Sequence, residues 1–289
     1  MSEESRPPEG EKTDADRIWD ALEEGNLEQA AEWIETLAPR LRSPAGPLED
    51  PPLTIAIGAA WLELGNAPEA RRLLDGEPWE RIDPARIEPD DEADRVWYLA
   101  QSLYQLGEPA AALDHLFRLQ PVERSERAGI LWWKGLCHDH LGERDRADRC
   151  FREAHELDPE QVRIPLSISP EEMSKVVRLA TVQLPAPVQE ALEEVPVVID
   201  DLPSIALVRG SDGSIDPDLL GLYTGRNLLE RSVFDSGELP PQIFLYRRNL
   251  ERFARTTGEL TREIEVTLLH ELGHHLGYEE EDLDSLGLA

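Results

Sequence analysis

Two histidines with a glutamate between them lie near the end of the chain, in the run His270-Glu271-Leu272-Gly273-His274. Residues four apart project from the same face of a helix, so both imidazoles can reach one tetrahedral metal ion, for which we expect zinc. Glu271 lies beside that metal, where a carboxylate can take a proton from a water molecule and later give it to a leaving amine. This HExxH spacing predicts His270 and His274 as metal ligands and Glu271 as the catalytic base. The alternative is an unremarkable His-Glu pair on an exposed helix face.

A catalytic zinc ion needs a third protein ligand, and carboxylates are abundant directly after the histidine pair. Gly277 can end the helix in a left-handed turn and lead the chain back toward the metal. At the position where an HExxHxxGxx pattern places its third ligand stands Glu280, our first candidate, with Asp284 and Glu281 next. The sequence leaves this choice open, because several oxygen donors compete and the same stretch could be a solvated acidic tail.

The helix that carries these residues is predicted over 260–277, where apolar side chains recur at helical spacing. Ahead of it we expect helices over 170–182 and 186–194 and short strands over 196–199, 219–223 and 242–246. A Gly/Asp/Ser loop over 209–218 separates the first two strands. Helices and strands in this order predict an α+β layout rather than a βαβ alternation.

Further side chains of this region are candidates for supporting roles. The strand 242–246 could pair with an extended peptide beside the metal, or it could be an internal strand of the sheet. Tyr223, Tyr246 and Tyr278 are candidates to stabilise an oxyanion, and no spacing rule selects one of them. His275 points elsewhere on the helix, so we expect it to pack or to support a neighbouring residue.

The N-terminal half is internally repetitive. A glycine closes one amphipathic helix in each of four stretches, and a small alanine follows five residues later: Gly25 and Ala30, Gly65 and Ala70, Gly107 and Ala112, Gly142 and Ala147. Glycine tolerates the left-handed conformation that ends a helix, and alanine lets the next helix pack closely. The glycines are 40, 42 and 35 residues apart, a period that indicates helix-turn-helix repeats.

The fourth stretch resembles the tetratricopeptide repeat most fully, through residues at that family's spacing: Gly135, Gly142, Ala147, Phe151, Ala154 and Pro159. We therefore expect a degenerate tetratricopeptide-like solenoid over residues 14–159. The resemblance implies a groove that binds a peptide or protein, since stacked helix pairs form a concave face. The alternative is a scaffold that only packs against the second domain.

The last hundred residues resemble the small bacterial zincin-like metallopeptidases. The similarity is carried by VPVVIDDLPS, GLYTG, LPPQIFLYRRNLER and the terminal HELGHHLGYEEEDLDSLG. Membership implies a compact α+β zincin-like fold for residues 160–289, with His270 and His274 as ligands, Glu271 as general base and an acidic residue near Glu280. No methionine follows the histidine pair, so the Met-turn of an ordinary metzincin is absent.

The composition excludes several classes of partner. A net charge of −31 would repel nucleic-acid phosphates and anionic membranes, and no apolar run approaches the roughly 20 residues that span a bilayer. Residues 1–13 lack an apolar core and are expected to be a disordered acidic tail rather than a signal peptide. The only two cysteines, Cys137 and Cys150, show no disulfide framework, which favours a reducing, cytoplasmic location.

Together these features predict an all-α repeat domain followed by a small α+β zincin-like domain. The favoured function is a zinc-dependent metallopeptidase that hydrolyses a protein substrate recruited by the repeats. The alternative is a non-catalytic adaptor or a metal-binding regulator, in which the zincin-like fold holds metal without turnover.

Overall fold

The computed structural model describes residues 12–41, 50–225 and 241–278. By internal contacts the chain divides into two compact units. The first unit comprises the chain up to Val162 together with Ile205–Asp216, and the second comprises Arg163–Ser204 together with the chain from Pro217 onward. The domain boundary predicted between residues 159 and 160 stays a prediction, and the contacts add that 205–216 pack with the first unit.

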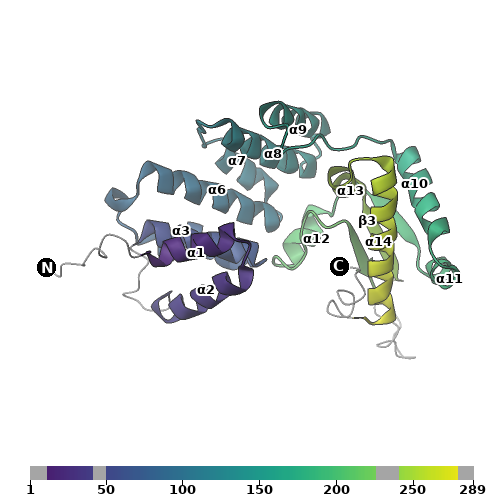
Figure 1. Ribbon diagram of the computed structural model, residues 1–289, viewed down its shortest axis with the longest axis horizontal. Coiled ribbons are helices and arrows are strands. Elements are labelled where there is room, and N and C mark those ends of the chain that lie inside the picture. Colours follow the sequence, from purple (N-terminus) through teal and green to yellow (C-terminus); the bar gives the residue numbers. More distant parts are fainter. Residues whose placement is uncertain (1–11, 42–49, 226–240, 279–289) are drawn as a thin grey trace. The chain divides into compact units, whose positions relative to one another are not determined.

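The first unit is built from helix pairs, one for each predicted repeat (Figure 1). In chain order the paired helices are α1 (Asp14–Glu23) and α2 (Leu27–Leu41), α3 (Pro51–Glu63) and α4 (Ala67–Asp75), α6 (Pro89–Gln105) and α7 (Pro109–Leu116), α8 (Arg124–His140) and α9 (Arg144–Leu157). The short helix α5 (Glu77–Glu80) and the 3-10 turn η1 (Pro84–Arg86) connect the second pair to the third. Of the predicted acidic tail, residues 1–11 lie outside the described residues, whereas Thr13 caps α1.

The glycines and alanines that predicted the repeats act as expected. The glycine after the first helix of each pair has a left-handed backbone: Gly25, Gly65, Gly107 and Gly142, with φ of 68°, 73°, 72° and 75°. The alanines that follow them are fully buried between helices: Ala30, Ala70, Ala112 and Ala147. In the fourth pair a Cβ at Gly135 would lie 2.5 Å from Phe151, so this glycine permits close packing of α8 on α9.

The segment 205–216 packs against the turns of the second and third repeats. It contains a short helix, α12 (Ile205–Gly210), where the sequence had predicted a loop from residue 209. Val208 is 1% exposed, and Arg209 donates from Nη2 to the Gly107 carbonyl at 3.0 Å. After the helix, Gly213 (φ 87°) lies against Pro68. The first unit is therefore made from two separate parts of the chain.

The second unit contains a three-stranded sheet covered by helices. Its elements are α10 (Pro170–Gln183), α11 (Ala186–Glu194), β1 (Val197–Asp200), β2 (Gly221–Thr224), β3 (Gln242–Tyr246), α13 (Arg247–Phe253) and α14 (Thr257–Leu276). The strand order is β1-β3-β2, with β1 parallel and β2 antiparallel to β3. Residues 242–246 therefore form the central strand of the described sheet, and β2 lies at an edge of it.

The core of the second unit lies between the sheet and α14, which packs on β2, β3, α10 and α13 (Figure 1). Its fully buried side chains come from the middle strand, α13 and one face of the long helix: Ile243, Leu245, Leu250, Leu260, Ile264 and Leu268. This arrangement and the repeat unit confirm the predicted fold class. Among the described residues, no helix is long and apolar enough to pass through a membrane.

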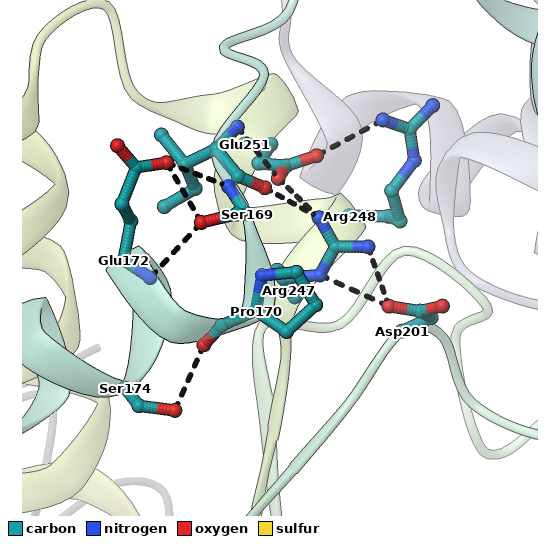
Figure 2. Close-up of polar contacts among 9 residues, drawn as sticks. Ser169, Pro170, Glu172, Ser174, Asp201, Arg247, Arg248 and Glu251 are labelled. Carbon is teal, nitrogen blue, oxygen red and sulfur yellow. Dashed lines mark hydrogen bonds and ion pairs between the residues drawn. The ribbon is translucent and has the colours of Figure 1, made fainter.

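A buried ionic network holds the first turns of α13 to the rest of the second unit (Figure 2). Glu251 is 0% exposed and accepts from Arg247 Nη1 at 2.6 Å and from Arg248 Nη1 at 2.9 Å. Arg247 also donates to Asp201 after β1 and to the carbonyl of Ile168. The network thus joins three chain segments that are distant in sequence, and it fixes the end of β3.

Ser169 begins α10 next to this network, as the sequence predicted. Its hydroxyl accepts from the Glu172 amide at 3.2 Å, and the Glu172 carboxylate accepts from the Ser169 amide at 2.9 Å. This reciprocal pair satisfies two backbone donors at the start of the helix. Figure 2 shows the capping pair beside the arginines of α13.

Candidate functional site

The helix α14 carries the histidine pair and has a defined beginning and end. The Thr256 side chain caps its start by accepting from the Glu259 amide at 3.1 Å. At the other end Gly277 has φ 92°, and the Tyr278 amide donates to the Gly273 carbonyl at 3.0 Å. The predicted left-handed turn at Gly277 is confirmed, and the helix is one turn longer at its start than predicted.

The side chains of His270 and His274 converge at their tips. Their Nε2 atoms are 3.0 Å apart, and the ring planes are almost perpendicular, at 81°. Two nitrogen ligands of one tetrahedral zinc ion, each at about 2.05 Å, would be about 3.3 Å apart. His274 also contacts the Tyr278 carbonyl through Nδ1 at 3.2 Å. When His274 Nδ1 carries the hydrogen for this contact, His274 Nε2 keeps its lone pair and can bind a metal ion. The two Nε2 atoms therefore fit two ligand positions of one cation.

Glu271 follows His270 in α14 and is held by the edge strand. Its carboxylate accepts a hydrogen bond at Oε2 from the Tyr223 amide at 2.6 Å, and the residue is 7% exposed. The strand can come this close because Gly221 has no side chain. A Cβ at Gly221 would lie 2.5 Å from Thr267 Cγ2 and 3.2 Å from Glu271 Cγ.

α13 positions the chain that enters β2. Asn249 is buried and donates through Nδ2 to the carbonyls of Pro217 and Leu219, at 2.9 and 2.6 Å. Arg252 donates to Asp218 Oδ1 at 2.8 Å. Since Gly221 follows two residues after Leu219, these contacts fix where β2 begins relative to α14.

His275 lies on the buried side of α14 and supports the sheet, as expected. It is 4% exposed, and its Nδ1 is 2.9 Å from the Tyr223 hydroxyl. Tyr246 is also buried at this end of β3, and burial raises the pKa of its phenol to about 12, with a further contribution from Asp200 and Glu271. Tyr278 is 46% exposed and meets the histidine pair through its backbone carbonyl.

The candidates for a third metal ligand are not placed by the structure. Glu280, Glu281 and Asp284 all lie outside the described residues. Within residues 12–41, 50–225 and 241–278, no group of three or more His, Cys, Asp or Glu side chains is arranged to hold a metal ion. The described site therefore consists of two imidazoles and one adjacent carboxylate.

The contribution of β2 to the site was missed from the sequence. We had considered residues 242–246 as a strand that could receive a peptide, but β3 has a neighbour on each side. The glycines of the run GLYTG were the available signal, because a glycine inside a strand often marks the close approach of another backbone or side chain.

Comparison with known families agrees with this architecture. Residues 192–288 match a family model described as zincin-like metallopeptidase. Residues 51–75 and 96–116 match a tetratricopeptide repeat model, so the matched repeats are the second and third rather than the fourth, which had looked the fullest. The chain thus combines tetratricopeptide repeats with a zincin-like domain, as predicted. None of the curated proteins compared with the chain matches it.

Proposed function

We propose that the chain is a zinc-dependent metallopeptidase whose second unit hydrolyses peptide bonds of a protein bound by the repeats. The observation that carries the proposal is the approach of His270 Nε2 to His274 Nε2, 3.0 Å apart, on the helix that also carries Glu271. The match of residues 192–288 to the zincin-like metallopeptidases supports it.

The two imidazoles are the residues we assign to zinc, with Glu280 as the third ligand and Glu281 and Asp284 as the other candidates. Neutral imidazole nitrogens and carboxylate oxygens are common zinc ligands. When bound, the zinc ion would polarise the scissile carbonyl and lower the pKa of a water molecule to about 7. The contact of His274 Nδ1 with the Tyr278 carbonyl holds the ring in the orientation needed.

Glu271 is the proton carrier in this proposal. The Tyr223 amide donates to Oε2 at 2.6 Å, so the carboxylate cannot rotate from its present position without losing this hydrogen bond. From this position it takes a proton from the attacking water and gives it to the nitrogen of the leaving amine. Both transfers use the same carboxylate, first as base and then as acid.

The edge strand and the repeats supply the binding surfaces. β2 lies at an edge of the described sheet, where an extended peptide can add a strand through backbone groups other than the Tyr223 amide, which already donates to Glu271. The tetratricopeptide matches support a protein-binding role for the first unit. Cys137 and Cys150 show no disulfide framework in the sequence, which favours a reducing, cytoplasmic setting.

Two substitutions test the proposal. Glu271→Gln should retain zinc, because both imidazoles remain, and should lower peptide cleavage by about 10²- to 10⁴-fold. His274→Ala should lose zinc. Elemental analysis after dialysis measures the zinc content, and mass spectrometry of a digested peptide library measures cleavage. Glu265→Gln on the same helix is the matched control and should retain both properties.

The outcomes separate the proposed enzyme from its alternative. An unchanged zinc content in His274→Ala would contradict the assignment of the site. If zinc binds but the peptide termini are identical for the wild-type chain and Glu271→Gln, the chain is a non-catalytic adaptor or a metal-binding regulator.

A further inference from the structure

Tyr223 contacts α14 twice, through its backbone and through its side chain. The amide donates to Glu271 Oε2 at 2.6 Å, and the hydroxyl lies 2.9 Å from His275 Nδ1. Glu271 and His275 are one helical turn apart on α14, with 7% and 4% of their surfaces exposed. A single strand residue therefore joins the candidate catalytic carboxylate to a buried histidine of the same helix.

The pairing of β2 explains why the Tyr223 amide is available to Glu271. The Tyr246 amide donates to the Leu220 carbonyl at 2.9 Å, so Leu220 and Tyr246 form a hydrogen-bonded pair. In an antiparallel ladder such pairs alternate with pairs whose backbone groups point outward. The pair of Tyr223 and Ile243 lies three positions along from the pair of Leu220 and Tyr246, so it is of the outward-pointing kind. The Tyr223 amide therefore points to the edge of the sheet, where it donates to Glu271.

The side chain of Tyr223 contacts His275 and lies close to Gly225. Its ring meets His275 at a centroid distance of 5.4 Å and an angle of 62°, in addition to the hydrogen bond. A Cβ at Gly225 (φ 136°) would lie 3.0 Å from the hydroxyl, so this glycine leaves space for the phenol. β2 has only four residues and is paired to β3 alone within the described sheet.

We propose that Tyr223 and His275 are positioning residues that hold the edge strand against α14 and thereby orient the Glu271 carboxylate. The hydroxyl–imidazole contact restrains the residue whose amide meets Oε2, because the hydroxyl and the amide both belong to Tyr223. The role in catalysis rests on the function proposed above. The positioning itself is a property of this chain's own residues and can be measured without metal.

Amide hydrogen exchange of the full-length, metal-free protein tests the positioning. Tyr223→Phe and His275→Phe each remove one partner of the hydroxyl–imidazole contact and leave the amide at position 223 in place. We expect exchange of that amide to become about three- to tenfold faster in either variant, the range expected for losing one hydrogen bond. The double variant should be no faster than the single variants, because both remove the same contact.

Three comparisons keep the test specific. His275→Asn retains a hydrogen-bonding group near the place of Nδ1 and should keep the slow exchange of the wild-type chain. Tyr98→Phe makes the same chemical change in a half-buried tyrosine of the first unit and should not alter exchange at position 223. The buried Leu245 amide in the central strand reports general opening of the sheet.

Unchanged exchange at position 223 in Tyr223→Phe would overturn the inference. So would equal acceleration at positions 223 and 245, since that result means a general loss of stability. In a cleavage assay, His275→Phe should lower kcat several-fold with little change in KM, and His275→Asn should restore it. If the wild-type chain cleaves no peptide, the proposed function fails, whereas the exchange experiment still decides whether the two residues position Glu271.

Discussion

Replacement of Gly221 by alanine is the sharpest test of how β2 and α14 fit together. The added Cβ would lie 2.5 Å from Thr267 Cγ2, whereas carbon atoms in contact are normally about 3.5–4.0 Å apart. Thr267 cannot easily rotate its methyl group away, because its Oγ1 donates to the Glu263 carbonyl at 2.8 Å. The strand must therefore move from the helix by about 1 Å.

The magnitude follows from two costs. Overpacking of a buried contact costs about 1–3 kcal/mol, and the shift stretches the 2.6 Å bond from the Tyr223 amide to Glu271, a charged acceptor worth about 1.5–3 kcal/mol. The two costs do not add in full, because moving the strand away reduces the overpacking while it stretches the hydrogen bond. We therefore expect the free energy of unfolding of the second unit to fall by about 2–4 kcal/mol.

The distribution of tryptophan provides the assay. All seven tryptophans belong to the first unit, so their fluorescence in urea follows that unit, while circular dichroism follows both. Gly221→Ala should shift the dichroism transition of the second unit and leave the fluorescence transition in place. Gly258→Ala is the control, because Gly258 lies in the first turn of α14 and an added Cβ would come no nearer than 3.8 Å to Thr256 Oγ1. Since alanine favours a helix more than glycine does, this change should stabilise the second unit by about 0.5–1 kcal/mol.

A second substitution shows whether the clash is the cause. Thr267→Ser removes Cγ2 and keeps the hydroxyl that bonds the Glu263 carbonyl. In the wild-type background it should destabilise the second unit by about 1 kcal/mol, as for one buried methyl group. In the Gly221→Ala background it should restore part of the lost stability, because the added Cβ would still lie 3.2 Å from Glu271 Cγ. If Gly221→Ala behaves like the wild-type chain, or if Thr267→Ser fails to rescue it, the close approach of β2 and α14 is wrong.

Two further predictions concern the network and the cap that flank the site. Arg247→Ala should lower the stability of the second unit by about 3–5 kcal/mol in urea denaturation, because Glu251 is 0% exposed and would lose its 2.6 Å partner. Arg247→Lys should recover part of this loss. An unchanged stability in Arg247→Ala would contradict the buried charge pair. The hydrogen bonds from Ser169 lower the pKa of Glu172, so this carboxylate stabilises the folded state above its unfolded pKa and loses that effect as the pH falls through the folded value. Glu172→Gln should therefore melt at a lower temperature than the wild-type chain at pH 7. The difference should shrink as the pH falls below the ordinary carboxyl pKa of 4.5 and on through the lower folded value, and an equal difference at low pH would rule out the charged cap.

The local features of this fold could be predicted from sequence because their causes are local. A glycine that ends a helix and a serine that begins one satisfy backbone groups within a few residues, so Gly107, Gly277 and Ser169 identified their helix ends correctly. The helix at 186–194 and the strand at 242–246 were also predicted at their observed limits.

The order of the strands could not be predicted in this way, because it depends on contacts between distant segments. Nothing near residues 242–246 indicates that β1 pairs with one side of this strand and β2 with the other. Val197 is opposite Ile243 on one side, and Leu222 is opposite Phe244 on the other. The amide of Tyr223 reaches Glu271 across 48 positions of sequence, and only the paired glycines of GLYTG hinted at it. The helix at 205–210 was missed because its stability comes from packing of Val208 rather than from helical periodicity.

The return of residues 205–216 to the first unit has a practical consequence for dissecting the chain. The backbone crosses from one unit to the other three times, after Val162, Ser204 and Asp216, so no single cut yields two intact pieces. A fragment that starts at residue 163 would carry Val208 without its apolar cover, and a fragment that stops at 162 would leave the Gly107 carbonyl without Arg209. A truncation meant to isolate the second unit should therefore replace residues 205–216 with a short flexible linker rather than simply remove the repeats.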